Sequence, residues 1–113
     1  DRAEAIADFI QARRVRREVL EICKHWLEDN PSPDEDGDDA TKALADYWKT
    51  RYWVQATMGE ANIGLENEDI AKELLTQAYS NASEKWMQES TETQIAKLQE
   101  LLNNSPLKFV QNN

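Results

Sequence analysis

The chain has 113 residues, a net charge of −9 and a hydrophobic fraction of 40%, with four tryptophans and one cysteine. This length gives one domain with a modest core, and the apolar content excludes global disorder. A negative surface disfavours nucleic acid, because phosphate binding requires positive charge. No apolar run approaches the roughly 20 residues of a membrane span, no signal peptide is recognised, and one cysteine provides no internal disulfide. We therefore expect a cytoplasmic protein with neither a nucleic-acid nor a membrane partner.

The first two helices are predicted from apolar spacing and from the residues that end them. Apolar residues at spacings of three and four from Arg2 to Glu28 predict a long amphipathic helix, which the prolines of Asn30-Pro31-Ser32-Pro33 terminate. A second helix is expected to start at Asp38 or Asp39 and to run to Met58, where Gly59 would close it. Residues 59–67 are then predicted to be a connection.

Two more helices are expected in the second half of the chain. Asn67 is predicted to cap a third helix that runs to about Gln88. Thr91 and Gln94 have capping-box spacing, which predicts a fourth helix that stops at Ser105-Pro106. No alternating strand pattern is present. The sequence therefore predicts one all-α, compact domain over residues 1–113, with about four helices and an acidic loop between the first two.

Acidic residues are concentrated before the second helix. Seven carboxylates and no basic residue lie between Glu28 and Asp39, and five of them fall in the six positions 34–39. Without these seven acids the net charge of −9 would be only −2. Like charges this close repel one another. Such a segment either stays hydrated as a solvated loop that caps the next helix, or docks on a basic partner, or binds a hard cation through oxygen ligands.

Calcium suits this pattern of residues. It takes about six to eight oxygen ligands in flexible geometry, commonly carboxylates, backbone carbonyls and water. Asp34, Asp36 and Asp38 occupy alternate positions, and Gly37 can provide a sharp turn between them. Neighbouring carboxylates can therefore converge on one ion.

The segment is nevertheless not an EF-hand. With Gly37 at the sixth loop position, Ser32 occupies the first position and Ala43 the twelfth, where a bidentate glutamate is required. Both anchoring ends of that loop are missing. A calcium site in this segment must therefore be built in another way.

A small acidic chain with no EF-hand and with the motif DEDGDD at 34–39 resembles the cyanobacterial calcium-binding proteins of the CcbP type. The ending LLNNSPLKFVQNN is compatible with that source. The resemblance implies a cytoplasmic protein that sequesters Ca²⁺ through surface acidic clusters and so influences heterocyst differentiation. It also implies more than one site of unequal affinity. The ligands that it implies for the main site are Asp34, Glu35, Asp36, Asp38 and Asp39. The best candidates for a second site are Glu66, Glu68 and Asp69.

The second acidic patch also has an ordinary explanation, since acids in the first turn of a helix complement its dipole. The arginines Arg13, Arg14, Arg16 and Arg17 have three open readings: a solvated face, a surface for an anionic partner, or internal pairing with the acidic segments. The aromatic residues are expected to pack in the core; they are Tyr47, Trp48, Tyr52 and Trp53. Because neighbours in sequence cannot all face inward, the alternative for Trp53 or Tyr52 is a place in a partner surface or over the acidic loop.

No hydrolase, phosphate-binding or dinucleotide motif is present, so we expect a protein that is not an enzyme. Two functions from different classes remain. The first is a calcium-binding protein that sequesters or buffers cytosolic Ca²⁺. The second is a small helical adaptor whose acidic loop docks on a basic protein partner of unknown identity.

Overall fold

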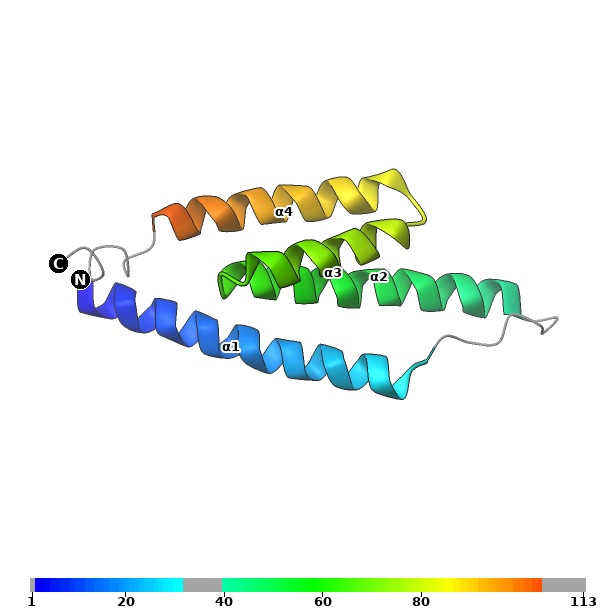
Figure 1. Cartoon of the computed structure of the whole chain (residues 1–113), viewed down its shortest axis with the longest axis horizontal. Helices are drawn as coiled ribbons and strands as arrows, with labels where there is room; N and C mark the ends of the chain where they lie inside the picture. The colour runs from blue at the N-terminus through cyan, green and yellow to red at the C-terminus, as the bar shows by residue number, and fades with distance from the viewer. Residues whose placement is uncertain (1, 32–39, 105–113) are drawn as a thin grey trace.

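A computed structural model describes residues 2–31 and 40–104 of the chain, and these residues form four helices (Figure 1). The helices are α1 (Arg2–Asp29), α2 (Ala40–Gly64), α3 (Glu68–Ser80) and α4 (Lys85–Asn103). No strand occurs in these two stretches, so the predicted all-α fold is confirmed. None of the helices described there has the length and apolar character needed to cross a membrane.

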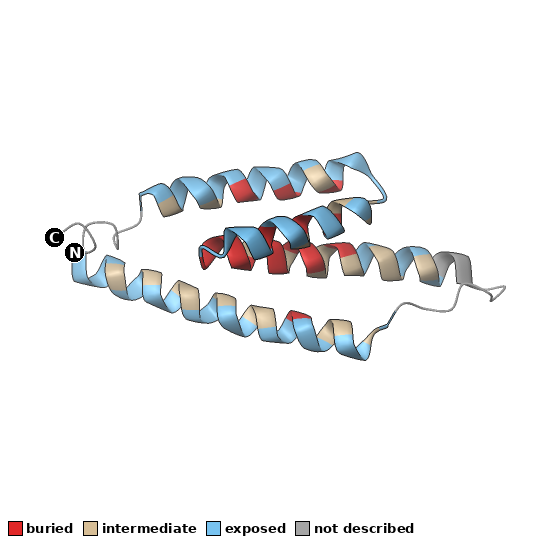
Figure 2. Cartoon of the chain, viewed as in Figure 1, coloured by how far each residue is buried: buried red, intermediate tan, exposed pale blue. Residues whose placement is uncertain are grey.

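The C-terminal half of α2 is the centre of the fold. In the described part of the chain, α1, α3 and α4 each make their main contacts with α2 and few with one another. Buried positions accordingly gather on this half of α2 and on the faces of α3 and α4 turned toward it (Figure 2). One buried cluster contains Tyr52, Ala56, Ala78 and Met87. A second cluster contains Ile63, Ala71, Leu75 and Ile95.

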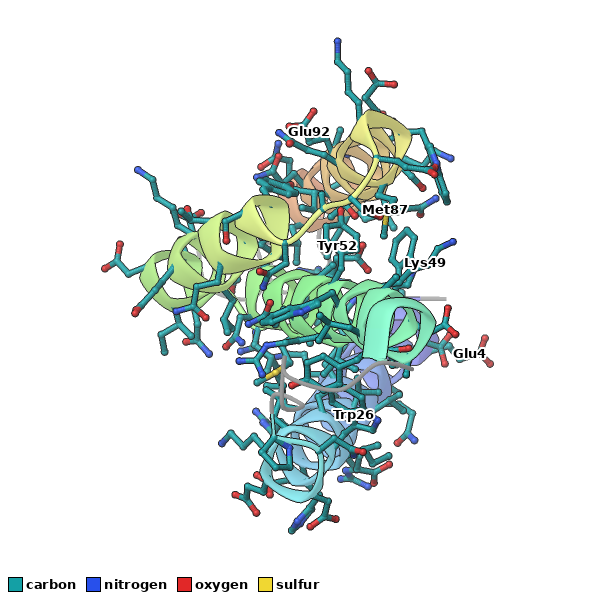
Figure 3. The ribbon with its side chains drawn as sticks, turned by 90° about the vertical axis from the view of Figure 1, so that its right-hand side faces the viewer. Glu4, Trp26, Lys49, Tyr52, Met87 and Glu92 are labelled. Atoms are coloured by element: carbon teal, nitrogen blue, oxygen red, sulfur yellow. The ribbon has the colours of Figure 1, made fainter. Side chains whose placement is uncertain are left out.

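Tyr52 ties α2 to α4 inside this core. Its side chain is 0% exposed, and its hydroxyl donates to the Met87 carbonyl over 2.8 Å (Figure 3). The same hydroxyl lies 2.6 Å from Oγ1 of Thr91. These bonds satisfy a polar group that would otherwise be costly to bury. Core packing is therefore confirmed for Tyr52, and its alternative place in an exposed partner surface is excluded.

The predicted end of the second helix is also wrong, because α2 continues through Gly59 to Gly64. A Cβ added at Gly59 would lie 2.7 Å from Cγ and Cδ2 of Leu75, so this glycine permits close contact with α3. The helix instead ends where Glu66 adopts φ 64°, with its N–H bonded to Ile63 O over 2.9 Å. The N–H of Asn67 bonds to Asn62 O over 2.8 Å, which completes a Schellman motif.

The third helix is shorter than predicted, since α3 ends at Ser80 and α4 begins at Lys85. At the break, Asn81 bonds through its backbone N–H to Ala78 O and through its side-chain amide to Gln55 Oε1, over 3.0 Å. The predicted helix start at Thr91 is wrong as well. Thr91 is buried inside α4, and its hydroxyl donates back to Met87 O over 3.1 Å.

Helix α1 runs antiparallel to α2 and reaches beyond it. The Trp26 ring stacks on Tyr47 near the start of α2, and Arg13 contacts Leu65 just past its end. The first three turns of α1 therefore extend past the end of α2. Cys23 is the one residue of α1 that is buried. Ile22, one of the apolar residues whose spacing predicted this helix, is 68% exposed.

Candidate metal-binding region and the groove between α3 and α4

The five acids of the predicted main calcium site lie outside the described residues; they are Asp34, Glu35, Asp36, Asp38 and Asp39. The structure does describe the joint from which this segment leaves. The Tyr47 hydroxyl donates to Asn30 O over 2.9 Å, and the Trp26 and Tyr47 rings stack with centroids 5.8 Å apart. Arg51 Nη1 donates to the Tyr47 hydroxyl over 2.8 Å. The end of α1 is therefore fastened to α2.

The acids of the predicted second site are all exposed and lie on either side of the turn between α2 and α3. Glu66 Oε2 lies 3.4 Å from Arg13 Nη1, and Arg13 also donates to Leu65 O over 3.3 Å. Internal acid pairing is thus confirmed for one residue of the arginine patch. Glu68 and Asp69 stand in the first turn of α3, where they complement the helix dipole.

No three His, Cys, Asp or Glu side chains gather as a metal-ligand set within residues 2–31 and 40–104. A second site at Glu66, Glu68 and Asp69 would therefore need ligands beyond those that the structure places there, or water. The assignment of these acids, like that of the main cluster, stays a prediction.

Sequence reasoning missed a small pocket of about 230 Å³ between α1, α2 and α4, in which Arg16 and Glu60 lie among mostly apolar surface. Burial lowers the pKa of Arg16, and the neighbouring charge of Arg13 lowers it further. Burial also raises the pKa of Glu60. Arg16 Nη1 is buried without a hydrogen-bond partner among the described residues. Both charged groups are therefore held in an environment that disfavours their ionised forms.

A larger groove lies between α3 and α4 and has a volume of about 430 Å³. Its floor consists of the buried residues Ile63, Ala71, Leu75 and Ile95. Its polar walls are provided by Glu68, Lys72, Thr76, Tyr79, Glu92 and Gln99. A second hollow of about 300 Å³ shares Ile63, Glu68 and Gln99 with it, so the groove continues toward the end of α4.

Glu92 of α4 and Tyr79 of α3 both line this groove. Burial raises the pKa of Tyr79, and the charge of Glu92 raises it further. Gln88 Nε2 donates to Glu92 Oε1 over 3.0 Å and so helps to orient that carboxylate. The sequence offered no signal for this arrangement, because the predicted third helix ran through the turn that brings α4 back beside α3.

In comparisons with known proteins, no protein-family model, curated protein or solved structure matches the chain. The resemblance to CcbP-type proteins accordingly rests on the acidic motif at 34–39 and on the size and charge of the chain. Functional assignment therefore depends on the chemistry of its own residues.

Proposed function

We propose that this protein binds calcium through the carboxylates of residues 34–39 and sequesters or buffers Ca²⁺ in the cytosol. The observation that carries the proposal is the placement of five acids in six positions, with Asp34, Asp36 and Asp38 alternating around Gly37. Calcium is the ion best suited to such a set, because it accepts many oxygen ligands in irregular geometry.

The joint between α1 and α2 supports this proposal. The bond from Tyr47 to Asn30 O and the stacked Trp26 ring hold the two helices together beside the acidic segment. The last turn of α1 contains no basic residue that could neutralise the acids. If α1 and α2 moved apart to reduce the repulsion between the carboxylates, these contacts would be lost. A bound divalent cation would reduce it directly.

Buffering agrees better with this architecture than sensing does. Sensor EF-hands respond to calcium by opening a helix pair and exposing an apolar groove. Here α1 and α2 are tied by an aromatic stack and a hydrogen bond, and the segment contains no EF-hand loop. Calcium should therefore stabilise the existing joint. At a hundredfold excess over Kd the stabilisation would be about 2.7 kcal/mol.

Calorimetric titration with calcium tests the proposal on protein stripped with chelator, in about 100 mM potassium chloride with excess magnesium. We expect a saturable isotherm of low integer stoichiometry that Asp38→Ala and Asp36→Ala weaken far more than Glu68→Ala does. Glu68→Ala is the comparison variant, because it removes the same charge outside the segment, at an exposed acid of the predicted second site. Equal losses in all three variants would show diffuse electrostatic attraction, and a flat trace would remove calcium binding.

The second candidate function is a helical adaptor whose acidic segment docks on a basic protein. It is favoured by the same seven acids without a base between Glu28 and Asp39. Such a surface should bind a lysine-rich peptide with steep salt dependence and should ignore millimolar calcium at constant ionic strength. The titration therefore separates the two functions.

A further inference from the structure

Helix α1 is attached to the domain without being part of its core. Both buried clusters consist of residues from α2, α3 and α4, and the half-buried residues packed against these clusters come from the same three helices. Figure 3 shows Trp26 of α1 on one side of α2 and Met87 of α4 on the other. We propose that α1 opens as a unit from a folded core of α2, α3 and α4, and that the unpaired charges of Arg16 and Glu60 set how readily it opens.

Two attachments hold the ends of the contact between α1 and α2. At one end Trp26 stacks on Tyr47, whose hydroxyl donates to Asn30 O over 2.9 Å. At the other end Arg13 lies 3.4 Å from Glu66, and more than half of the Glu66 side chain is exposed. An ion pair exposed in this way contributes little to stability. The free energy of attachment therefore depends strongly on the middle of the contact.

The middle of the contact contains two charged groups without partners. Arg16 of α1 and Glu60 of α2 lie in the pocket between α1, α2 and α4, beside the apolar residues Val19, Ala61 and Leu98. Neither charged side chain forms a hydrogen bond or an ion pair in the part of the chain that the structure describes, and Nη1 of Arg16 is buried. When α1 closes on α2, both charges therefore lose water and gain no bond in return, which favours the open state. The lowered pKa of Arg16 and the raised pKa of Glu60 have the same main cause, which is burial of the charged group.

Amide hydrogen exchange tests the proposal, followed by NMR on the full chain at neutral pH and in chelator, so that calcium has no part in the result. Most of the stability of a helix in a protein comes from its packing, so a detached α1 loses helical structure and exchanges its amides. We expect the amides in the middle of α1 to share one protection factor, at least about tenfold lower than that of the slowest amides of α2. Equal protection in the two helices would mean that α1 opens only when the whole domain unfolds, and would overturn the proposal.

A core variant separates the opening of α1 from global unfolding. Tyr52→Phe removes the hydroxyl that bonds to Met87 O and Thr91, and it should lower the protection of the slowest α2 amides about fivefold. The protection of α1 should change less than twofold, because the core is folded in both the closed and the open state. A parallel fall in α1 and α2 would contradict an opening of α1 by itself.

Two variants of the pocket test the role of the charges against matched exposed positions. Arg16→Met and Glu60→Gln remove the charge from a side chain of similar length, and each should raise the protection of α1 about threefold or more. Arg14→Met and Glu73→Gln make the same changes at exposed positions of α1 and α3, and should change it less than twofold. Circular dichroism should show the same helix content in all variants. Unchanged or lower protection of α1 in the two pocket variants would overturn the role assigned to Arg16 and Glu60.

Discussion

Helix α1 is longer than α3, yet α3 has more buried residues. α1 has 28 residues, of which one, Cys23, is buried, whereas α3 has 13 residues and buries Ala71, Leu75 and Ala78. The difference arises from small residues at the contact with α2. The α2 and α3 backbones approach closely because the contact is made by the small residues Ala71, Ala78 and Gly59. The contact of α1 with α2 is made through larger side chains, such as Arg16 and Trp26, which hold the two helices farther apart. A long amphipathic stripe therefore does not by itself define the core.

The largest expected effect contrasts the core with α1. Tyr52→Ala should lower the free energy of unfolding by about 3–5 kcal/mol, because it opens a cavity in the core and removes the hydrogen bonds of the Tyr52 hydroxyl with Met87 O and Thr91. Ile22→Ala should change it by less than about 0.5 kcal/mol, since Ile22 is 68% exposed. Chemical denaturation followed by circular dichroism measures both values. Comparable losses would show that α1 is part of the core.

Two glycines of α2 sharpen the comparison, because Gly59 faces α3 and Gly64 faces α1. Gly59→Ala should destabilise by about 1–2 kcal/mol, since the new Cβ would overlap Leu75 in a packed core. At Gly64 the new Cβ would meet the flexible side chain of Arg16, which can move toward solvent. Gly64→Ala should therefore be neutral, or stabilising by up to about 1 kcal/mol through helix propensity. Thermal melts would contradict this account if the two variants shifted the melting temperature equally.

The smallest expected effect lies at the end of α2, where α1 meets the turn. Glu66 has φ 64°, a left-handed conformation that costs a residue other than glycine about 1–2 kcal/mol. Glu66→Gly should stabilise the fold by about 0.5–1 kcal/mol, because the lost pair with Arg13 is an exposed one of little energy.

Glu68→Gly is the control for this variant, since the same change inside the first turn of α3 should destabilise by up to about 1 kcal/mol. Both variants are compared by urea denaturation. A destabilised Glu66→Gly protein would mean that the contact between Arg13 and Glu66 holds α1 in place more strongly than its exposure suggests.

The sequence predicted the number and type of elements because apolar periodicity and proline breaks are local signals. The start of α1 and the start of α3 at Glu68 agree with the structure for this reason. The errors arose where tertiary contacts override local preference. Gly59 looked like a helix end but serves close packing against Leu75, and Thr91 looked like a cap but bonds to Tyr52.

The sites were less predictable than the elements. The pairing of Arg13 with Glu66 joins residues 53 positions apart, which no local pattern reveals. The groove depends on the turn at residues 81–84, whose position is fixed in part by the bond from Asn81 to Gln55 on another helix. The acidic motif at 34–39 was visible in the amino-acid sequence itself. Its role as a calcium site is a prediction that the calcium titration tests.

The burial of Cys23 has a consequence for the kinetics of opening. It is the single cysteine of the chain, it lies on the face of α1 turned toward α2, and burial raises the pKa of its thiol. A thiol reagent can modify it only when α1 lifts away, because the thiolate is the reactive form and needs solvent. The rate of alkylation thus reports how often α1 detaches while α2, α3 and α4 remain folded. The reactivity of Cys23 therefore measures the rate at which the least buried helix, α1, opens.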